Sequence, residues 1–229
     1  MQYNQIHDFS DNIEKMKNIQ LEIKEKLTFN QLEKQPKIIS GVDLSIINGT
    51  HGLSVITTLD FNTLELLDIT YSVKKLEMEY IPGFLAFREL PVFLQSWEKL
   101  KLDPDIVFFD GHGYAHPRRA GIASHASLFI DKPTVGIGKS LLVGKYEEPD
   151  NTKGAYTYIY HKNEIIGAVL KTKLNVKPVF ISAGNHITLE QSIDLSMQLT
   201  TKYRLPEITR IADSYTKKLK VEIKPEDLN

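Results

Sequence analysis

The sequence predicts an α/β fold, with a mixed central sheet and helices on both of its faces. Three observations predict it. Apolar residues alternate with period two through three consecutive segments near the N-terminus, which is typical of antiparallel strands joined by short turns. A short, nearly continuous apolar run follows at residues 105–110, of the kind that is buried on both faces of a sheet. Segments with apolar residues every three or four positions lie around these strands and indicate amphipathic helices.

Length and composition limit the class of protein. The 229 residues contain no Pro/Gly/Ser-rich linker, no low-complexity tract and no repeat, so we expect a single domain over residues 1–229. No run approaches 18 apolar residues and no secretory signal opens the chain, which predicts a cytoplasmic protein without membrane spans. The absence of cysteine excludes disulfides, cysteine nucleophiles and thiolate metal sites. The net charge of −1 removes the simplest argument for a nucleic-acid-binding protein.

The N-terminal half begins with a helix and continues as a meander. Apolar residues spaced by three and four predict an amphipathic helix at about 11–27, peripheral to the rest. Period-two alternation then predicts strands at 37–47, 51–59 and 64–73. The pair Asn48-Gly49 is a strong reversal signal between the first two strands. These strands therefore form an antiparallel meander.

The remaining elements alternate between helices and short strands. A helix is expected at 83–100, a buried strand at 105–110, a helix at 121–130, a strand at 133–137, a hairpin around 156–160 and 165–170, and a strand at 179–182. A capping box at Thr188 and a proline at Pro206 open the last two helices. This order is that of the ribonuclease H-like fold, with a central sheet of the five-stranded type and a small extra hairpin region.

Two aspartates stand out by their positions on the predicted sheet. Asp43 lies in the middle of the first strand, and Asp110 ends the buried strand. If the two strands are neighbours, the carboxylates converge, and their repulsion calls for a cation such as Mg²⁺ or Mn²⁺ between them. From position alone, the alternative is equally good: Asp43 faces water at an edge, and Asp110 caps a turn.

Two further carboxylates need a stronger argument. Glu89 lies on the helix at 83–100, where a lone glutamate is by default solvated. Asp213 lies off the apolar stripe of the last helix, so position alone places it in solvent.

Long motifs in a fixed order resemble those of the endonuclease V family. The resemblance covers most of the chain, from about Ser40 to Leu219. The segments that carry it are Tyr80–Glu89, Asp110–Gly113, His116–His125, Pro133–Ser140, Pro178–Thr188 and Tyr203–Glu207. The family has a ribonuclease H-like fold, in agreement with the order of the elements.

The resemblance implies a DNA repair endonuclease. Such an enzyme recognises deaminated purines, chiefly deoxyinosine, and hydrolyses the second phosphodiester bond 3′ to the lesion in a Mg²⁺-dependent reaction, with Mn²⁺ able to substitute. By position in the motifs, Asp43, Glu89 and Asp110 correspond to the metal ligands, Asp213 to a supporting group, and Lys139 to a catalytic lysine beside the scissile phosphate. The partner is inosine-containing DNA, or RNA, and the protein is expected to be a monomer.

The same motifs imply how the lesion is recognised. Tyr80, held by Pro82, would enter the duplex as a wedge when the altered base is flipped out. The pocket for that base is expected to be formed by Gly83, Leu85, Gly111, Gly113, His116, Gly121, Gly136 and Gly138. Phosphate contacts are expected from Arg88, Arg118 and Arg119.

The sequence also departs from the family pattern. Glu79 stands in the place of a proline, His112 and Tyr114 are unusual in their motif, and Asn185-His186 replaces the more usual His-Arg pair. Two other functions therefore remain open: an inosine-specific endoribonuclease acting on single-stranded RNA, and a non-catalytic nucleic-acid-binding module on the same fold. Between Gly111 and Lys145 there are five Lys or Arg residues and one Asp, so the near-zero net charge conceals a locally basic region.

Overall fold

The computed structural model describes residues 1–224 and 228, and in these residues it contains every expected helix and strand, with ends that differ by at most a few residues. The elements are α1 (Ile13–Lys26), β1 (Ile38–Ile47), β2 (His51–Asp60), β3 (Leu66–Lys75), α2 (Leu85–Lys99), β4 (Ile106–Phe109), α3 (Ile122–Ile130), β5 (Thr134–Gly138), β6 (Tyr156–His161), β7 (Glu164–Leu170), β8 (Val179–Asn185), α4 (Leu189–Gln198) and α5 (Glu207–Glu222). Among these helices, none has the combination of length and apolar character that crossing a membrane requires.

The eight strands found in the described residues all belong to one mixed sheet. Their order is β3-β2-β1-β4-β5-β8-β7-β6. The contacts β1–β4 and β4–β5 are parallel, and the other neighbours are antiparallel. The mixed sheet is confirmed, with one difference: the expected extra hairpin is continuous with it, because Ala168–Leu170 of β7 pair with Val179–Ile181 of β8.

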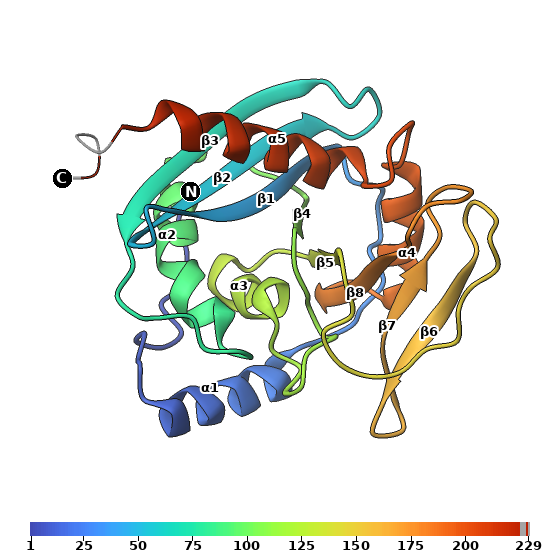
Figure 1. Cartoon of the computed structure of the whole chain (residues 1–229), viewed down its shortest axis with the longest axis horizontal. Coiled ribbons are helices and arrows are strands. Elements are labelled where there is room, and N and C mark those ends of the chain that lie inside the picture. Colours follow the sequence, from blue (N-terminus) through green and yellow to red (C-terminus); the bar gives the residue numbers. More distant parts are fainter. Residues whose placement is uncertain (225–227, 229) are drawn as a thin grey trace.

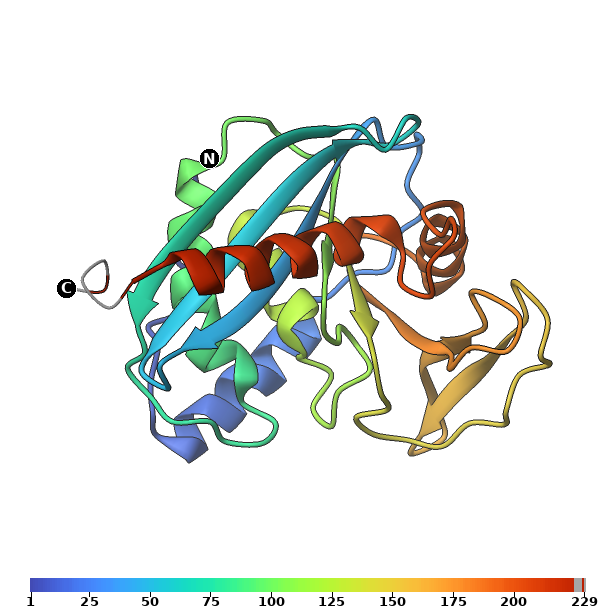
Figure 2. The same ribbon diagram turned by 45° about the horizontal axis from the view of Figure 1, so that its top comes forward.

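Helices cover both faces of the sheet. In Figures 1 and 2, α5 crosses the strands of the meander on one face, and α2 and α3 lie on the other. The four residues of β4 are all buried, and they alternate between the two layers: Phe108 packs in the core cluster that contains Ile208 of α5, and Phe109 packs in the cluster that contains Phe93 of α2. The prediction of a strand buried on both faces is therefore confirmed.

Helix α1 packs against α3 and against the start of α2. Its residues Met16, Ile19 and Ile23 are buried in a cluster with Phe84 and Phe87. Because this cluster lies directly below the start of α2, α1 supports the loop that leads into that helix.

The topology brings three chain segments to one edge of the sheet. Strands β1, β4 and β5 run parallel, so their carboxyl ends lie together. Asp110 follows β4 and donates its backbone N–H to the carbonyl of Val42 at 3.0 Å. The N–H of Gly111 donates to the carbonyl of Ile137 at 3.2 Å, which ties this turn to β5.

Candidate active site

Three carboxylates meet at this edge of the sheet. Asp43 comes from β1, Asp110 from the turn after β4, and Asp213 from α5, and each offers an oxygen within 4.8 Å of the others. They form what we call the catalytic cluster. Asp213 reaches it because α5 packs across β1, so a residue that appeared solvated on a helical wheel faces the strand.

The carboxylates of the catalytic cluster repel one another, and the Lys139 cation forms hydrogen bonds with two of them. Asp43 is only 9% exposed, and burial, followed by the charges of Asp110 and Asp213, raises its pKa well above the usual range. The Lys139 ammonium donates hydrogen bonds to Asp110 and, at 3.2 Å, to Asp213. Burial alone would lower the pKa of Lys139, but these two carboxylates raise it overall. The lysine thus offsets only part of the negative charge.

Glu89 lies at the margin of this cluster. It lines the same cavity as the three aspartates, about 340 Å³ in volume, but it is outside the tight triad. Burial raises the pKa of Glu89 to about 8, with smaller contributions from Asp43 and Asp110, while Arg88 opposes the shift. The cavity therefore contains an excess of carboxyl groups that a divalent cation would stabilise.

The donor set suits a hard divalent metal ion. All candidate ligands are carboxylate oxygens, the atoms that Mg²⁺ and Mn²⁺ prefer. Burial is the main cause of the raised pKa of Asp43, and repulsion from Asp110 and Asp213 adds to it. A cation between the carboxylates would offset that repulsion. Asp43, Asp110 and Asp213 could therefore hold such an ion, with Glu89 within the same cavity.

A second, smaller cavity adjoins the catalytic cluster and contains six of the ten residues expected to form the wedge and pocket. Its volume is about 110 Å³. The residues that line it are Gln20, Tyr80, Gly83, Leu85, Ala86, Gly111, His112, His116, Ala120, Gly121, Ile122 and Leu142. Leu85 lines both cavities, and Gly111 directly follows Asp110 of the cluster. We call this space the base cavity.

Three of the expected pocket glycines lie behind the base cavity instead of lining it. A Cβ atom on Gly113 would approach the Ala183 carbonyl oxygen to 2.4 Å, and one on Gly136 would approach the Gly113 nitrogen to the same distance. A Cβ on Gly138 would lie 2.4 Å from the His112 ring. These glycines, which we call the glycine layer, allow neighbouring backbones to pack together.

The tyrosine expected to act as the wedge is exposed on a fixed loop. Tyr80 is 56% exposed, and Pro82 beside it is also exposed. The carbonyl of Gly83, at the end of this loop, accepts hydrogen bonds from Gln20 Nε2 at 2.9 Å and Arg118 Nη2 at 2.8 Å. The loop is therefore anchored at its base while the aromatic ring remains free.

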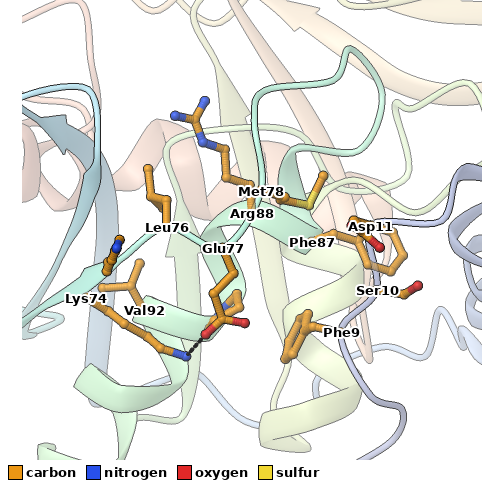
Figure 3. A pocket seen from close by; sticks show the side chains of 12 residues that line it. Phe9, Ser10, Asp11, Lys74, Leu76, Glu77, Met78, Phe87, Arg88 and Val92 are labelled. Carbon is orange, nitrogen blue, oxygen red and sulfur yellow. Dashed lines mark ion pairs between the residues drawn. The ribbon is translucent and has the colours of Figure 1, made fainter.

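The three arginines expected to contact phosphates have different surroundings. Arg118 holds the Tyr80 loop, as described above. Arg119 is buried in an ion pair with Glu164 at 2.7 Å, which joins its loop to β7. Figure 3 shows Arg88 on a cavity of about 300 Å³ between residues 9–11, the end of β3 and α2, with its guanidinium directed away from the Lys74–Glu77 ion pair.

The departures from the family pattern mostly have structural partners. Asn185 Oδ1 accepts from the backbone N–H of Thr28 at 2.7 Å, and His186 Nδ1 lies 2.9 Å from the Thr28 hydroxyl. This pair fixes the chain that leaves α1. The Tyr114 hydroxyl donates to Glu164, and His112 packs against Gly138. Glu79 lies on the outer side of the Tyr80 loop, facing solvent.

Sequence reasoning missed several residues of the site. Thr216 lines the same cavity as Asp43 and acts to lower the pKa of that carboxyl, and Lys217 donates to Asp213 at 2.5 Å. Both lie three or four positions after Asp213, so helical spacing could have identified them. Gln20 is a buried amide four residues after Met16, and this polar residue next to an apolar stripe was the available signal. Ile122 and Leu142 gave no signal of their own.

Comparisons with known proteins agree on one family. The family model described as Endonuclease V matches residues 21–214. A protein from Petrotoga mobilis named endonuclease V is 52% identical over 220 residues, which are 96% of this chain and 99% of that protein. The crystal structure of the Bacillus subtilis endonuclease V is 32% identical with a TM-score of 0.90, covering 97% of this chain and 98% of that one. The Ciona intestinalis endonuclease V, solved in complex with a 24mer DNA containing an inosine followed by a ribo-adenosine, is 27% identical with a TM-score of 0.82, covering 94% and 100%.

Proposed function

The chain belongs to the endonuclease V family, and on that premise we propose that it nicks nucleic acid at inosine, hydrolysing the second phosphodiester bond 3′ to the lesion. One observation carries the proposal. A small cavity shares the wall formed by Leu85 with a cluster of three carboxylates, and Gly111 of the cavity follows Asp110 of the cluster. A flipped base and the phosphates of its own strand can therefore be held side by side.

The catalytic cluster is proposed to bind Mg²⁺ through Asp43, Asp110 and Asp213, with Mn²⁺ as a substitute and Glu89 as a further ligand or proton acceptor. Bound metal supplies Lewis acidity and lowers the pKa of a coordinated water. The chain's own contribution is to hold the phosphate near these oxygens. Lys139, which directly follows β5 and donates a hydrogen bond to Asp110, is placed to offset charge that develops on the phosphoryl oxygens.

The base cavity is proposed to accept hypoxanthine. This base carries an O6 acceptor where adenine carries an amino group, so a site with fixed donors favours it. The N–H groups of Gly111 and Gly121 already donate to the carbonyls of Ile137 and Gly113. The first-turn N–H groups of α2 at Leu85 and Ala86 have no acceptor within the helix, and these residues line the cavity. They are the better candidates to recognise O6.

Neighbouring groups would keep the flipped base in place. Burial, followed by the charge of Arg118, lowers the pKa of His116 to about 3, so its ring is neutral and adds no charge to the cavity. The exposed Tyr80 ring would fill the space that the base leaves in the duplex.

A nicking assay with matched strands tests the proposal. Single- and double-stranded DNA, and single-stranded RNA, each with one inosine or one adenine, are incubated with the protein and Mg²⁺, and the cut position is mapped. We expect cleavage at the second phosphodiester bond 3′ to the inosine, which joins the first and second nucleotides that follow it. DNA should be cleaved in preference to RNA. Preferred cleavage of RNA would instead establish the endoribonuclease alternative. Binding of inosine strands without cleavage at any Mg²⁺ or Mn²⁺ concentration would overturn the proposal in favour of a non-catalytic module.

A further inference from the structure

Two connections form a basic surface at the end of the sheet where the catalytic cluster lies. The connection between β7 and β8 (171–178) contains Lys171, Lys173 and Lys177, and the one between α4 and α5 (199–206) contains Lys202 and Arg204; neither contains an Asp or Glu. They pack together: Thr172 Oγ1 donates to the Arg204 carbonyl at 2.7 Å, and Lys173 Nζ donates to the Lys202 carbonyl at 2.5 Å. We call this surface the double loop.

The double loop begins at the catalytic lysine. Arg204 Nη2 donates to the backbone carbonyl of Lys139 at 3.1 Å and to that of Pro178 at 2.7 Å. The same guanidinium therefore joins the segment that carries Lys139 to both connections. Lys177 and Lys202 are exposed residues. A nucleic-acid strand that extends from the catalytic cluster on this side would therefore bring its next phosphates close to positive charge.

On its other side the double loop reaches β6. Strand pairing aligns Gly138 with Phe180, Phe180 with Val169, and Val169 with Thr157. Three strand spacings of about 4.8 Å place β6 only about 14 Å from the end of β5. The N–H of Lys171 donates to the Ala155 carbonyl at 2.8 Å, so the double loop continues directly into the start of β6.

Strand β6 presents a row of tyrosines at this point. Tyr156, Tyr158 and Tyr160 alternate with inward residues, and all three line one open groove with Lys145 and Glu147. Tyr156 and Tyr160 are 42% and 50% exposed. The backbone of Tyr160 is already paired with Lys145 on the outer side of the strand, at 2.8 and 2.9 Å. An occupant of the groove would therefore contact tyrosine side chains and not extend the sheet as another strand.

We propose that the substrate strand continues from the catalytic cluster across the double loop, where lysines bind its phosphates, and that its unpaired bases then stack on the β6 tyrosines. This inference rests on the proposed function, since it extends the path of the same substrate. Proteins that bind single-stranded nucleic acid combine these two features: positively charged side chains that contact the backbone and aromatic side chains on which the bases stack. The proposed path of the strand also accounts for the exposed aromatic rings of Tyr156 and Tyr160 on an edge strand of the sheet.

The lysines are tested by salt dependence. We compare Lys177→Gln/Lys202→Gln with a control pair, Lys37→Gln/Lys101→Gln, whose exposed lysines lie at the opposite end of the sheet. Affinity for a single-stranded 30-mer without inosine is measured against salt concentration. The test pair should lower the slope of log K against log salt by about 1.4, since each phosphate contact contributes about 0.7 for single strands. The control pair should leave the slope unchanged.

The tyrosines are tested by strand length. Single-turnover nicking is measured on an inosine strand extended by two nucleotides on each side and on strands extended by twelve on the 5′ or the 3′ side. Tyr156→Leu/Tyr160→Leu should raise the half-saturating enzyme concentration at least about fivefold on one of the two long strands. The leucine pair should nick at the wild-type rate when the enzyme is saturating. Its half-saturating concentration on the short strand should also equal that of the wild type. Tyr156→Trp/Tyr160→Trp should restore binding, and Tyr71→Leu, on the opposite edge strand β3, should change nothing.

Two results would overturn this inference. The first is an unchanged salt slope in the lysine pair, and the second is equal half-saturation for wild type and the leucine pair at every strand length. Either would assign the surface to something other than the substrate strand, such as a protein partner. Failure of the proposed function has a different signature, because the wild-type protein would then not nick even the short inosine strand.

Discussion

The catalytic cluster and the glycine layer lie next to each other but are built on opposite principles. In the cluster, Asp43, Asp110 and Asp213 bring like charges within 4.8 Å, and the fold gains nothing from their approach. In the glycine layer, Gly113 and Gly136 let two backbones touch with no room for a methyl group. The proposed function assigns the first region to chemistry, and the close backbone contacts assign the second to packing.

The difference shows that a functional motif mixes two kinds of residue. Gly111 lines the base cavity, whereas Gly113, two residues later in the same motif, packs against Ala183 behind it. Arg118 anchors the Tyr80 loop, whereas its neighbour Arg119 is buried against Glu164. Substitutions in one motif should therefore separate into those that remove activity and those that remove stability.

The largest expected effect is loss of activity in the cluster. Asp43→Asn should reduce the nicking rate at least about 10³-fold, because it removes one of the carboxylates proposed to hold the metal ion that stabilises the transition state. The free energy of unfolding should stay within about 1 kcal/mol of wild type, since the substitution also removes a repulsive charge. Single-turnover nicking and thermal melting measure the two effects. Asp194→Asn, exposed on α4, is the control. A large loss of stability in Asp43→Asn would erase the contrast between the regions.

The glycine layer should behave in the reverse way. In Gly136→Ala the new Cβ would lie 2.4 Å from the Gly113 nitrogen, so one backbone must shift, at a cost of about 3 kcal/mol in the free energy of unfolding. Calorimetry should show the melting temperature fall by about 6–12 °C. Gly49→Ala is the matched control: its backbone has φ +74° but nothing lies within 4 Å, so it should lose only about 1 kcal/mol. Equal losses in the two variants would contradict close packing as the cause.

The contrast also explains what the sequence could reveal. The order and type of the elements followed from apolar periodicity, because each strand and helix buries a regular set of side chains. The continuity of the hairpin with the sheet did not follow from apolar periodicity. The pairing of Ala168–Leu170 with Val179–Ile181 depends on the register between two segments that carry no distinctive residues.

The sequence predicted the positions of some site residues better than those of others. The convergence of Asp43 and Asp110 could be expected only on the condition that their strands are neighbours, and the pairing of β1 with β4 meets that condition. The position of Asp213 could not be expected in this way, because its distance from the cluster depends on how α5 crosses β1. The glycines of the pocket motifs could be listed but not divided into those that line the cavity and those behind it, because that division depends on backbone approaches of a few ångströms.

The rim of the base cavity offers an intermediate effect. Tyr80→Ala removes an exposed ring, so stability should be unchanged while the preference for inosine over adenine duplexes falls by about tenfold, the equivalent of about 1.4 kcal/mol. Competitive nicking of the two duplexes measures the ratio. Tyr71→Ala, 45% exposed on β3, serves as the control. An undiminished preference would remove Tyr80 from the role of wedge and leave discrimination to the cavity alone.

The last expected effect concerns the pH dependence of stability without metal. The pKa of Glu89 rises from 4.5 in its ordinary state to about 8 in the fold, mainly through burial. Between these values the folded chain binds more protons than the unfolded chain, so the free energy of unfolding falls as pH rises from 4.5 to 8. In Glu89→Gln this decline should be shallower by about 1.4 kcal/mol for each pH unit between the two pKa values, and Asp43, whose pKa is also raised, should account for part of what remains. Chemical denaturation in EDTA across this range measures it, with Glu98→Gln, exposed on the same helix, as control. A parallel pair of curves for wild type and Glu89→Gln would show that the charge on Glu89 is tolerated in the fold, and that the cost of assembling the site lies in the three aspartates alone.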